Sequence, residues 1–137
     1  MKIDHVAIWA DDIELLRRFY VKYFGAAASA RYENPSKHYS SYFLAFPDSS
    51  TRLELMQKPG IDNPPSPRGL PKGLTHIAFS LDSPQMVDEL TGALKRDGYA
   101  IVSEPRLTGD GCYESVVEDT EGNWVEIVAE RRSDDEN

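Results

Sequence analysis

Apolar and polar residues alternate in two short stretches, residues 3–9 and 74–81, and each stretch carries one histidine. In the first, Val6 and Ile8 share one face and His5 lies on the other. Because successive side chains of a strand point to opposite faces, this pattern predicts two strands that cover a core with their aliphatic residues. The histidine of each strand is expected on the face turned away from that core.

A helical pattern follows each histidine strand, and three more strand patterns follow each helix. Apolar residues recur at helical spacing from about residue 12 to 24 and from about 83 to 98, with capping residues before them and a glycine after them. The remaining strands are predicted at residues 27–32, 39–46, 51–56, 99–103, 112–118 and 123–129.

The two halves also match in sequence, since His76 follows His5 by 76 − 5 = 71 positions and Ala78 follows Ala7 by the same interval. A repeat of this kind indicates one structural module used twice. The predicted fold class is α+β, with two βαβββ modules that form a curved mixed sheet around a metal-binding cleft and carry their helices on the outer face.

The predicted domain organisation is a single domain, residues 1–130. Module one covers residues 1–58 and module two residues 73–130. Residues 59–72 hold five of the nine prolines and are predicted to be the linker between them. The polar tail, residues 131–137, is predicted to be disordered.

Composition limits the possible partners. With 40% hydrophobic and 28% charged residues, the 137-residue chain is typical of a soluble globular protein. Its 15 basic and 23 acidic residues give a net charge of −8, which disfavours nucleic-acid binding. No stretch is apolar enough for a membrane span or a signal peptide, and the single Cys112 cannot form an internal disulfide. We expect a cytoplasmic protein without membrane or nucleic-acid partners.

The last strand of each half carries one glutamate between aliphatic residues. These are Glu54 and Glu126, and both are expected on the face opposite the core, as His5 and His76 are. Each residue alone is as well explained by a structural or solvent-facing role. Their matching positions favour a site, because two imidazoles and two carboxylates suit a divalent ion such as Ni, Zn, Co, Mn or Fe.

The twin modules and the order His5, Glu54, His76, Glu126 resemble the vicinal oxygen chelate superfamily, and bacterial glyoxalase I within it. The resemblance extends from residue 2 to about residue 130 and includes the turns at residues 33–35 and 118–122. It implies that the four residues bind one divalent metal ion. It also implies a homodimer, with the site formed within one chain or across two.

The same resemblance implies a lyase of the lactoylglutathione lyase type, which isomerises its substrate by proton transfer through a metal-bound enediolate. The substrate would be a small molecule with vicinal oxygens. Glu126 is predicted to remove the proton and Glu54 to return it on the other face. The rival functions are a metal-independent small-molecule or antibiotic-binding protein, as in bleomycin resistance, and an Fe(II) extradiol-type dioxygenase.

Trp9 stands where glyoxalase I usually has an arginine that holds a carboxylate of glutathione. An indole cannot replace this bidentate contact, so specificity for a glutathione adduct does not follow from the resemblance. The residues predicted to line the substrate pocket are Trp9, Met56, Tyr113 and Trp124. Ordinary packing is the alternative for each of them.

Overall fold

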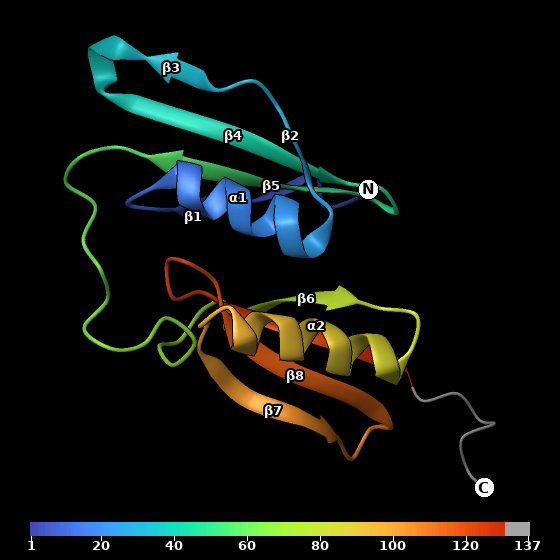
Figure 1. Ribbon diagram of the computed structural model, residues 1–137. Coiled ribbons are helices and arrows are strands. Elements are labelled where there is room, and N and C mark those ends of the chain that lie inside the picture. The colour runs from blue at the N-terminus through green and yellow to red at the C-terminus, as the bar shows by residue number, and fades with distance from the viewer. Residues whose placement is uncertain (131–137) are drawn as a thin grey trace, which may run out of the picture. The chain divides into compact units, whose positions relative to one another are not determined.

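The computed structural model describes residues 1–130, so the predicted tail at residues 131–137 lies outside the described residues. The chain divides into two compact units, Met1–Asn63 and Pro64–Asn137 (Figure 1). This division falls inside the predicted linker, residues 59–72. The union of the two units into a single domain stays a prediction, and each unit is described by itself.

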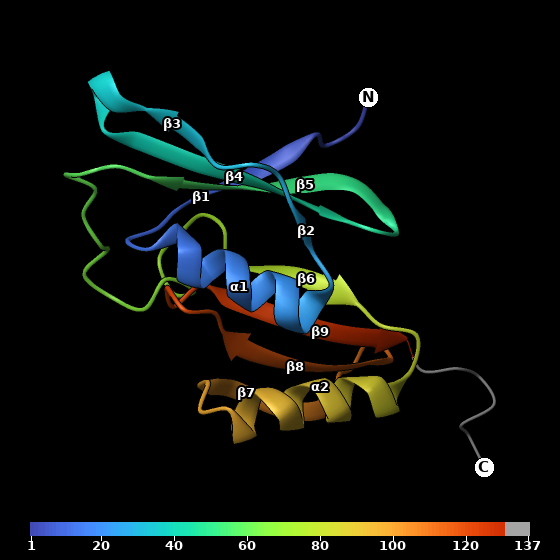
Figure 2. The ribbon, with the colours of Figure 1, turned by 45° about the horizontal axis from the view of Figure 1, so that its top comes forward.

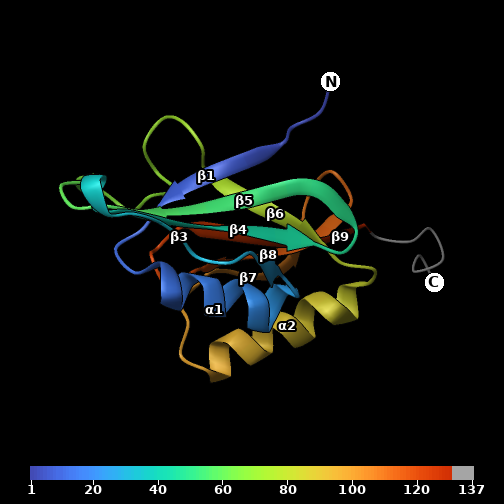
Figure 3. The same cartoon turned by 90° about the horizontal axis from the view of Figure 1, so that it is seen from above.

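The first unit is a mixed sheet with one α-helix. Its elements are β1 (His5–Trp9), α1 (Ile13–Phe24), β2 (Ala27–Ala28), β3 (Tyr32–Asn34), the short 3₁₀ helix η1 (Pro35–Lys37), β4 (Tyr39–Phe46) and β5 (Ser49–Gln57). The strand order is β1-β5-β4-β2, with β3 also paired to β4. Figure 3 shows β1, β5 and β4 side by side. Strand β1 runs parallel to β5, and the other pairs are antiparallel. The single strand predicted at residues 27–32 is wrong, because two separate short strands pair with β4 there.

The second unit repeats this plan. Its elements are β6 (His76–Ser80), α2 (Pro84–Arg96), β7 (Ile101–Leu107), β8 (Cys112–Glu118) and β9 (Trp124–Glu130). The strand order is β6-β9-β8-β7, with β6 parallel to β9 and α2 lying along the sheet (Figure 2). Strand β7 is longer than predicted and contains Pro105, which a sheet tolerates because β7 is an edge strand with an irregular register. The predicted fold of two α+β modules is confirmed, with one mixed sheet in each.

In both units the helix covers one face of the sheet and leaves the other face available for polar groups. In the first unit, Leu16 and Tyr20 of α1 are fully buried, as is Leu55 on β5. In the second unit, Val87 of α2 and Ile127 of β9 are fully buried. The alternation predicted from the sequence is therefore confirmed for the strands that carry the glutamates. Within residues 1–130, no helix is long and apolar enough to cross a membrane.

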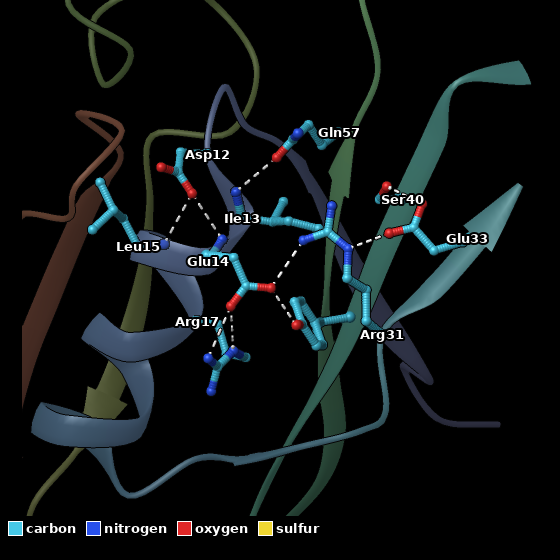
Figure 4. A network of polar contacts seen from close by, with 10 residues as sticks. Asp12, Ile13, Glu14, Leu15, Arg17, Arg31, Glu33, Ser40 and Gln57 are labelled. Atoms are coloured by element: carbon cyan, nitrogen blue, oxygen red, sulfur yellow. Dashed lines mark hydrogen bonds and ion pairs between the residues drawn. The ribbon is translucent and has the colours of Figure 1, made fainter. Parts of the chain in front are cut away.

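A polar network centred on Glu14 joins α1 to the sheet of the first unit (Figure 4). The carboxylate of Glu14 accepts hydrogen bonds from Arg17 Nη2 at 2.9 Å, from Arg31 Nη1 at 2.9 Å and from the hydroxyl of Tyr42. These hydrogen bonds, that of Tyr42 foremost, lower the pKa of Glu14 to about 2, from an ordinary value of 4.5. The charged form of Glu14 therefore stabilises the fold.

Replacement of Glu14 by glutamine is expected to lower the free energy of unfolding at pH 7 by about 1–2 kcal/mol, because Gln accepts weaker hydrogen bonds and the side chain is one-third exposed. The contribution of Glu14 is fully present above pH 4.5 and is lost as the pH falls towards 2. Urea unfolding of Glu14→Gln at several pH values would measure both effects. Glu89→Gln, on the exposed face of α2, is the control and is expected to match the parent protein.

Candidate metal centre

In the first unit, His5 and Glu54 meet on the face of the sheet opposite α1. They come from the parallel neighbours β1 and β5, where Ala7 lies opposite Glu54 in the register. His5 Nε2 lies 3.3 Å from Glu54 Oε2, and the Glu54 side chain is only 16% exposed. Ala7 has a small side chain and lies directly beside Glu54. The imidazole of His5, two residues earlier on the same face, can therefore reach the carboxylate.

The second unit forms the same pair. His76 on β6 and Glu126 on β9 are again on parallel neighbours, and Ala78 lies opposite Glu126. His76 Nε2 lies 3.0 Å from Glu126 Oε2, and the Glu126 side chain is 15% exposed. Each unit therefore brings together one of the two predicted histidines and one of the two predicted glutamates.

The first pair has further polar partners that the sequence did not reveal. The hydroxyl of Tyr39, at the start of β4, donates to Glu54 Oε1 at 3.0 Å. Asp4 Oδ2 lies 2.8 Å from His5 Nδ1 and accepts from Arg52 Nη2 at 2.9 Å. The hydrogen bonds from His5 and Arg52 hold the pKa of Asp4 below its ordinary value. The pair therefore has hydrogen-bond partners on both sides.

The second pair has a different environment, because a second carboxylate lies beside it. In the register of β8 and β9, Val116 is opposite Glu126, so Glu114 lies two residues away on the same face. The pKa of Glu126 lies above its ordinary value, mainly because the side chain is buried and also because Glu114 lies beside it, while the neighbouring His76 opposes this rise. The sequence predicts that Glu114 lies in a strand. Its position beside Glu126 depends on the register between β8 and β9, which the sequence does not give.

The donor atoms of each pair have a separation that fits a divalent metal ion. Two ligands bound at about 2.1 Å and at right angles to each other lie about 3 Å apart. The nitrogen–oxygen distances of 3.3 and 3.0 Å in the two pairs agree with this value. Among residues 1–130, no three His, Cys, Asp or Glu side chains gather closely enough to hold an ion, so each pair alone offers two protein donors.

Two of the four predicted pocket residues lie on the same face as the first pair. Trp9 lies opposite Met56 in the register, two residues along each strand from Ala7 and Glu54. The indole of Trp9 packs edge-on against Tyr39 at 6.3 Å between ring centres, and Lys58 Nζ lies 5.0 Å above it. This face therefore combines aromatic surface with two cations near the His–Glu pair, Lys58 and Arg52.

The other two predicted pocket residues are placed differently. Trp124 shares the face of His76, but Gly69 of the predicted linker packs directly against its indole ring. Tyr113 lies on the opposite face of its sheet, where its hydroxyl donates to Asp88 of α2 at 2.6 Å. The structure thus does not bring Tyr113 together with the second pair, because residues of odd number on β8 face the helix.

Replacement of Gly69 by alanine is expected to push the linker away from Trp124, since the added Cβ would lie 2.0 Å from a ring atom. We expect a loss of about 1–3 kcal/mol in the free energy of unfolding, the usual effect of overpacking. In a Trp9→Phe background, the emission of Trp124 should also shift to the red.

Gly109→Ala is the matched control, because a Cβ there meets no atom within 4 Å and neither glycine has a positive φ. An unchanged emission spectrum and unfolding midpoint in Gly69→Ala would contradict the described contact.

Comparison with known proteins identifies the family. Residues 2–127 match the Glyoxalase/Bleomycin resistance protein/Dioxygenase superfamily, and the chain belongs to this family. It is 27% identical over 128 residues to the uncharacterised protein YqjT of Bacillus subtilis (strain 168), a match that covers 91% of this chain and 96% of YqjT.

Solved structures share the fold at low sequence identity. A glyoxalase/bleomycin resistance protein/dioxygenase domain from Frankia sp. EAN1pec superposes with a TM-score of 0.80 at 18% identity, and the match covers 97% of this chain and 94% of that domain. Glyoxalase I from Zea mays superposes with a TM-score of 0.76 at 22% identity over 93% of this chain. This chain spans 44% of the length of the maize protein.

Proposed function

We propose that the chain is a divalent-metal-dependent lyase of the glyoxalase type, which isomerises the adduct of a 2-oxoaldehyde and a thiol. The observation that carries this proposal is the repeated pair, one histidine and one glutamate at matching positions in both units. Membership of the glyoxalase superfamily supports it.

The proposed metal ligands are Nε2 of His5 and His76 and one carboxylate oxygen each of Glu54 and Glu126. Two neutral imidazoles and two carboxylates carry a charge of −2, which balances a divalent ion of Ni, Zn, Co, Mn or Fe. When bound, the ion would supply Lewis-acid stabilisation of the negative charge that develops on two vicinal substrate oxygens.

The two glutamates would also move the proton. We assign Glu126 as the base that removes a proton from the carbon next to the carbonyl, and Glu54 as the group that returns it on the other face. The surroundings of Glu126 support this assignment, because the side chain is largely buried and lies beside Glu114. A carboxylate in such a place accepts a proton more readily than one in water.

The complete site would join the two units of one chain or of two chains in a homodimer. Each pair alone offers two protein donors, which is fewer than the three or four protein ligands usual for a catalytic or structural zinc site. We further propose a cytoplasmic location, as the composition predicts. Light scattering of the metal-free and metal-loaded protein would measure the oligomeric state.

Elemental analysis of the protein as purified, followed by a hemithioacetal assay with several thiols and metals, tests the proposed function. We expect turnover that EDTA abolishes and that one of the five metals restores. A protein with no bound metal and no turnover with any metal and thiol would contradict the proposal.

A metal-independent small-molecule-binding protein is the second candidate. The observation in its favour is the aromatic face formed by Trp9 and Tyr39 with Lys58 above the indole. Such a protein would bind its ligand with unchanged affinity in EDTA and would show quenching of Trp9 on titration. Oxygen uptake in the presence of Fe²⁺ would instead identify an extradiol-type dioxygenase.

A further inference from the structure

The carboxylate of Glu54 has both oxygens engaged by named partners. Oε2 faces His5 Nε2 at 3.3 Å, and Oε1 accepts the hydrogen bond from Tyr39 at 3.0 Å. Because Oε1 accepts from Tyr39, the carboxylate cannot rotate without breaking the Tyr39 hydrogen bond. Tyr39 therefore fixes which oxygen of Glu54 is directed towards the imidazole.

The phenol ring of Tyr39 is itself held in place. Strand β4 is antiparallel to β5, and Phe43 lies opposite Glu54, so Tyr39 lies on the same face four residues earlier. Its ring packs against Trp9 at 6.3 Å and against Tyr32 at 6.1 Å between ring centres. The hydroxyl can thus act as a fixed donor.

The imidazole of His5 is fixed by a second contact. Asp4 Oδ2 lies 2.8 Å from His5 Nδ1, and the same oxygen accepts from Arg52 Nη2 at 2.9 Å. A carboxylate at Nδ1 favours the tautomer with its proton there, which leaves the lone pair on Nε2. Nε2 is the atom that faces Glu54.

Within residues 64–130, the second unit shows no equivalent of these contacts. Thr75 stands where Asp4 stands in the first unit, because 75 − 4 is again 71. Cys112 occupies the position on β8 that corresponds to Tyr39, four residues before the one opposite the glutamate. Two carboxylates, Glu114 and Asp110, act on Glu126 instead, and Glu114 also shares a side-chain hydrogen bond with it. Neither is a phenol held by aromatic packing, as Tyr39 is.

We propose that Tyr39 and Asp4 are positioning residues, which hold Glu54 and His5 in place and make the first pair the more rigid half of the metal site. This inference rests on the proposed function and assigns different tasks to two halves that the sequence repeat makes look equivalent. The residues held in place by an outer layer of hydrogen bonds bind a metal more tightly than residues without one.

The test is a titration of the metal-free protein with Co²⁺, in which calorimetry measures the Kd and visible absorption reports the ligand geometry. We expect the Kd for Co²⁺ to rise about 10–100-fold in Tyr39→Phe and in Asp4→Asn, the usual effect of losing an outer-layer partner. The Co²⁺ absorption bands should also change in position, since the geometry of the ligands changes. Thr75→Val, at the matching place in the second unit, should bind like the parent protein.

Tyr32→Phe is the control for the aromatic packing, because Tyr32 contacts the Tyr39 ring and is 55% exposed. Binding by Tyr39→Phe and Asp4→Asn within twofold of the parent protein would overturn this inference alone. Equal weakening in Tyr32→Phe and Tyr39→Phe would also overturn it, since the hydroxyl would then be irrelevant. A parent protein that binds no Co²⁺ would overturn the proposed function together with the inference.

Discussion

Replacement of Glu126 by glutamine is expected to lower kcat/KM for a hemithioacetal substrate by about 10³-fold, within the range for loss of a general base. Glutamine keeps the size of the side chain and one oxygen donor, but it cannot accept the substrate proton. The loss should therefore appear mainly in kcat, with a smaller change in metal content. Steady-state kinetics and elemental analysis of the same preparation would separate the two effects.

Glu130→Gln is the matched control for this experiment. Glu130 lies on the same strand and the same face, four residues after Glu126, but it is exposed at the end of β9. Its replacement is expected to leave turnover within about twofold, as for most surface substitutions. Full turnover together with full metal content in Glu126→Gln would show that Glu126 is not the base.

Replacement of His76 by alanine is expected to remove both metal binding and turnover. His76 supplies one of the two proposed nitrogen ligands, and its loss would leave Glu126 without the imidazole 3.0 Å away. Loss of a residue that only holds a ligand in place costs up to about 100-fold in metal affinity. Because His76 is itself a proposed ligand, we expect the Kd for Co²⁺ to rise at least about 100-fold. His5→Ala should have the same effect, because one ion is proposed to need both pairs.

His38 provides the control, since it is the third histidine and lies outside both pairs. It is exposed and has a φ of 52°, a left-handed conformation that asparagine adopts readily. His38→Asn is therefore expected to fold and to bind Co²⁺ like the parent protein. Normal metal binding by either His5→Ala or His76→Ala would contradict the shared site.

Much of the fold could be predicted because hydrophobic alternation and local capping are properties of short segments. Leu53 and Leu55 face the core as their spacing requires, and Asp12 caps α1 by accepting from the backbone N–H of Glu14 and Leu15. The extent of β7 could not be predicted, because Pro105 is acceptable only in an irregular edge strand. Which strand lies at the edge depends on the strand order of the whole sheet, and not on a short segment of sequence.

The site could be predicted only as far as the repeat made it visible. His5 and Glu54 were found from matching positions, and the structure pairs them. The contact from Tyr39 depends on the register between β4 and β5, which side-chain alternation alone does not fix. The position of Tyr113 on the helix face could not be predicted for the same reason, because it follows from the pairing of β8 with β9.

The proposed metal site requires that His5 and His76 bind the same ion although they lie in different units. X-ray absorption spectroscopy of the Co²⁺-loaded or Zn²⁺-loaded protein counts imidazole ligands. The atoms of the histidine ring beyond the bound nitrogen give a characteristic multiple-scattering signal. We predict one ion per chain with two imidazole ligands, and one imidazole fewer in the His5→Ala protein forced to bind at high metal concentration. Two ions per chain with one imidazole each, or no imidazole at all, would contradict the claim.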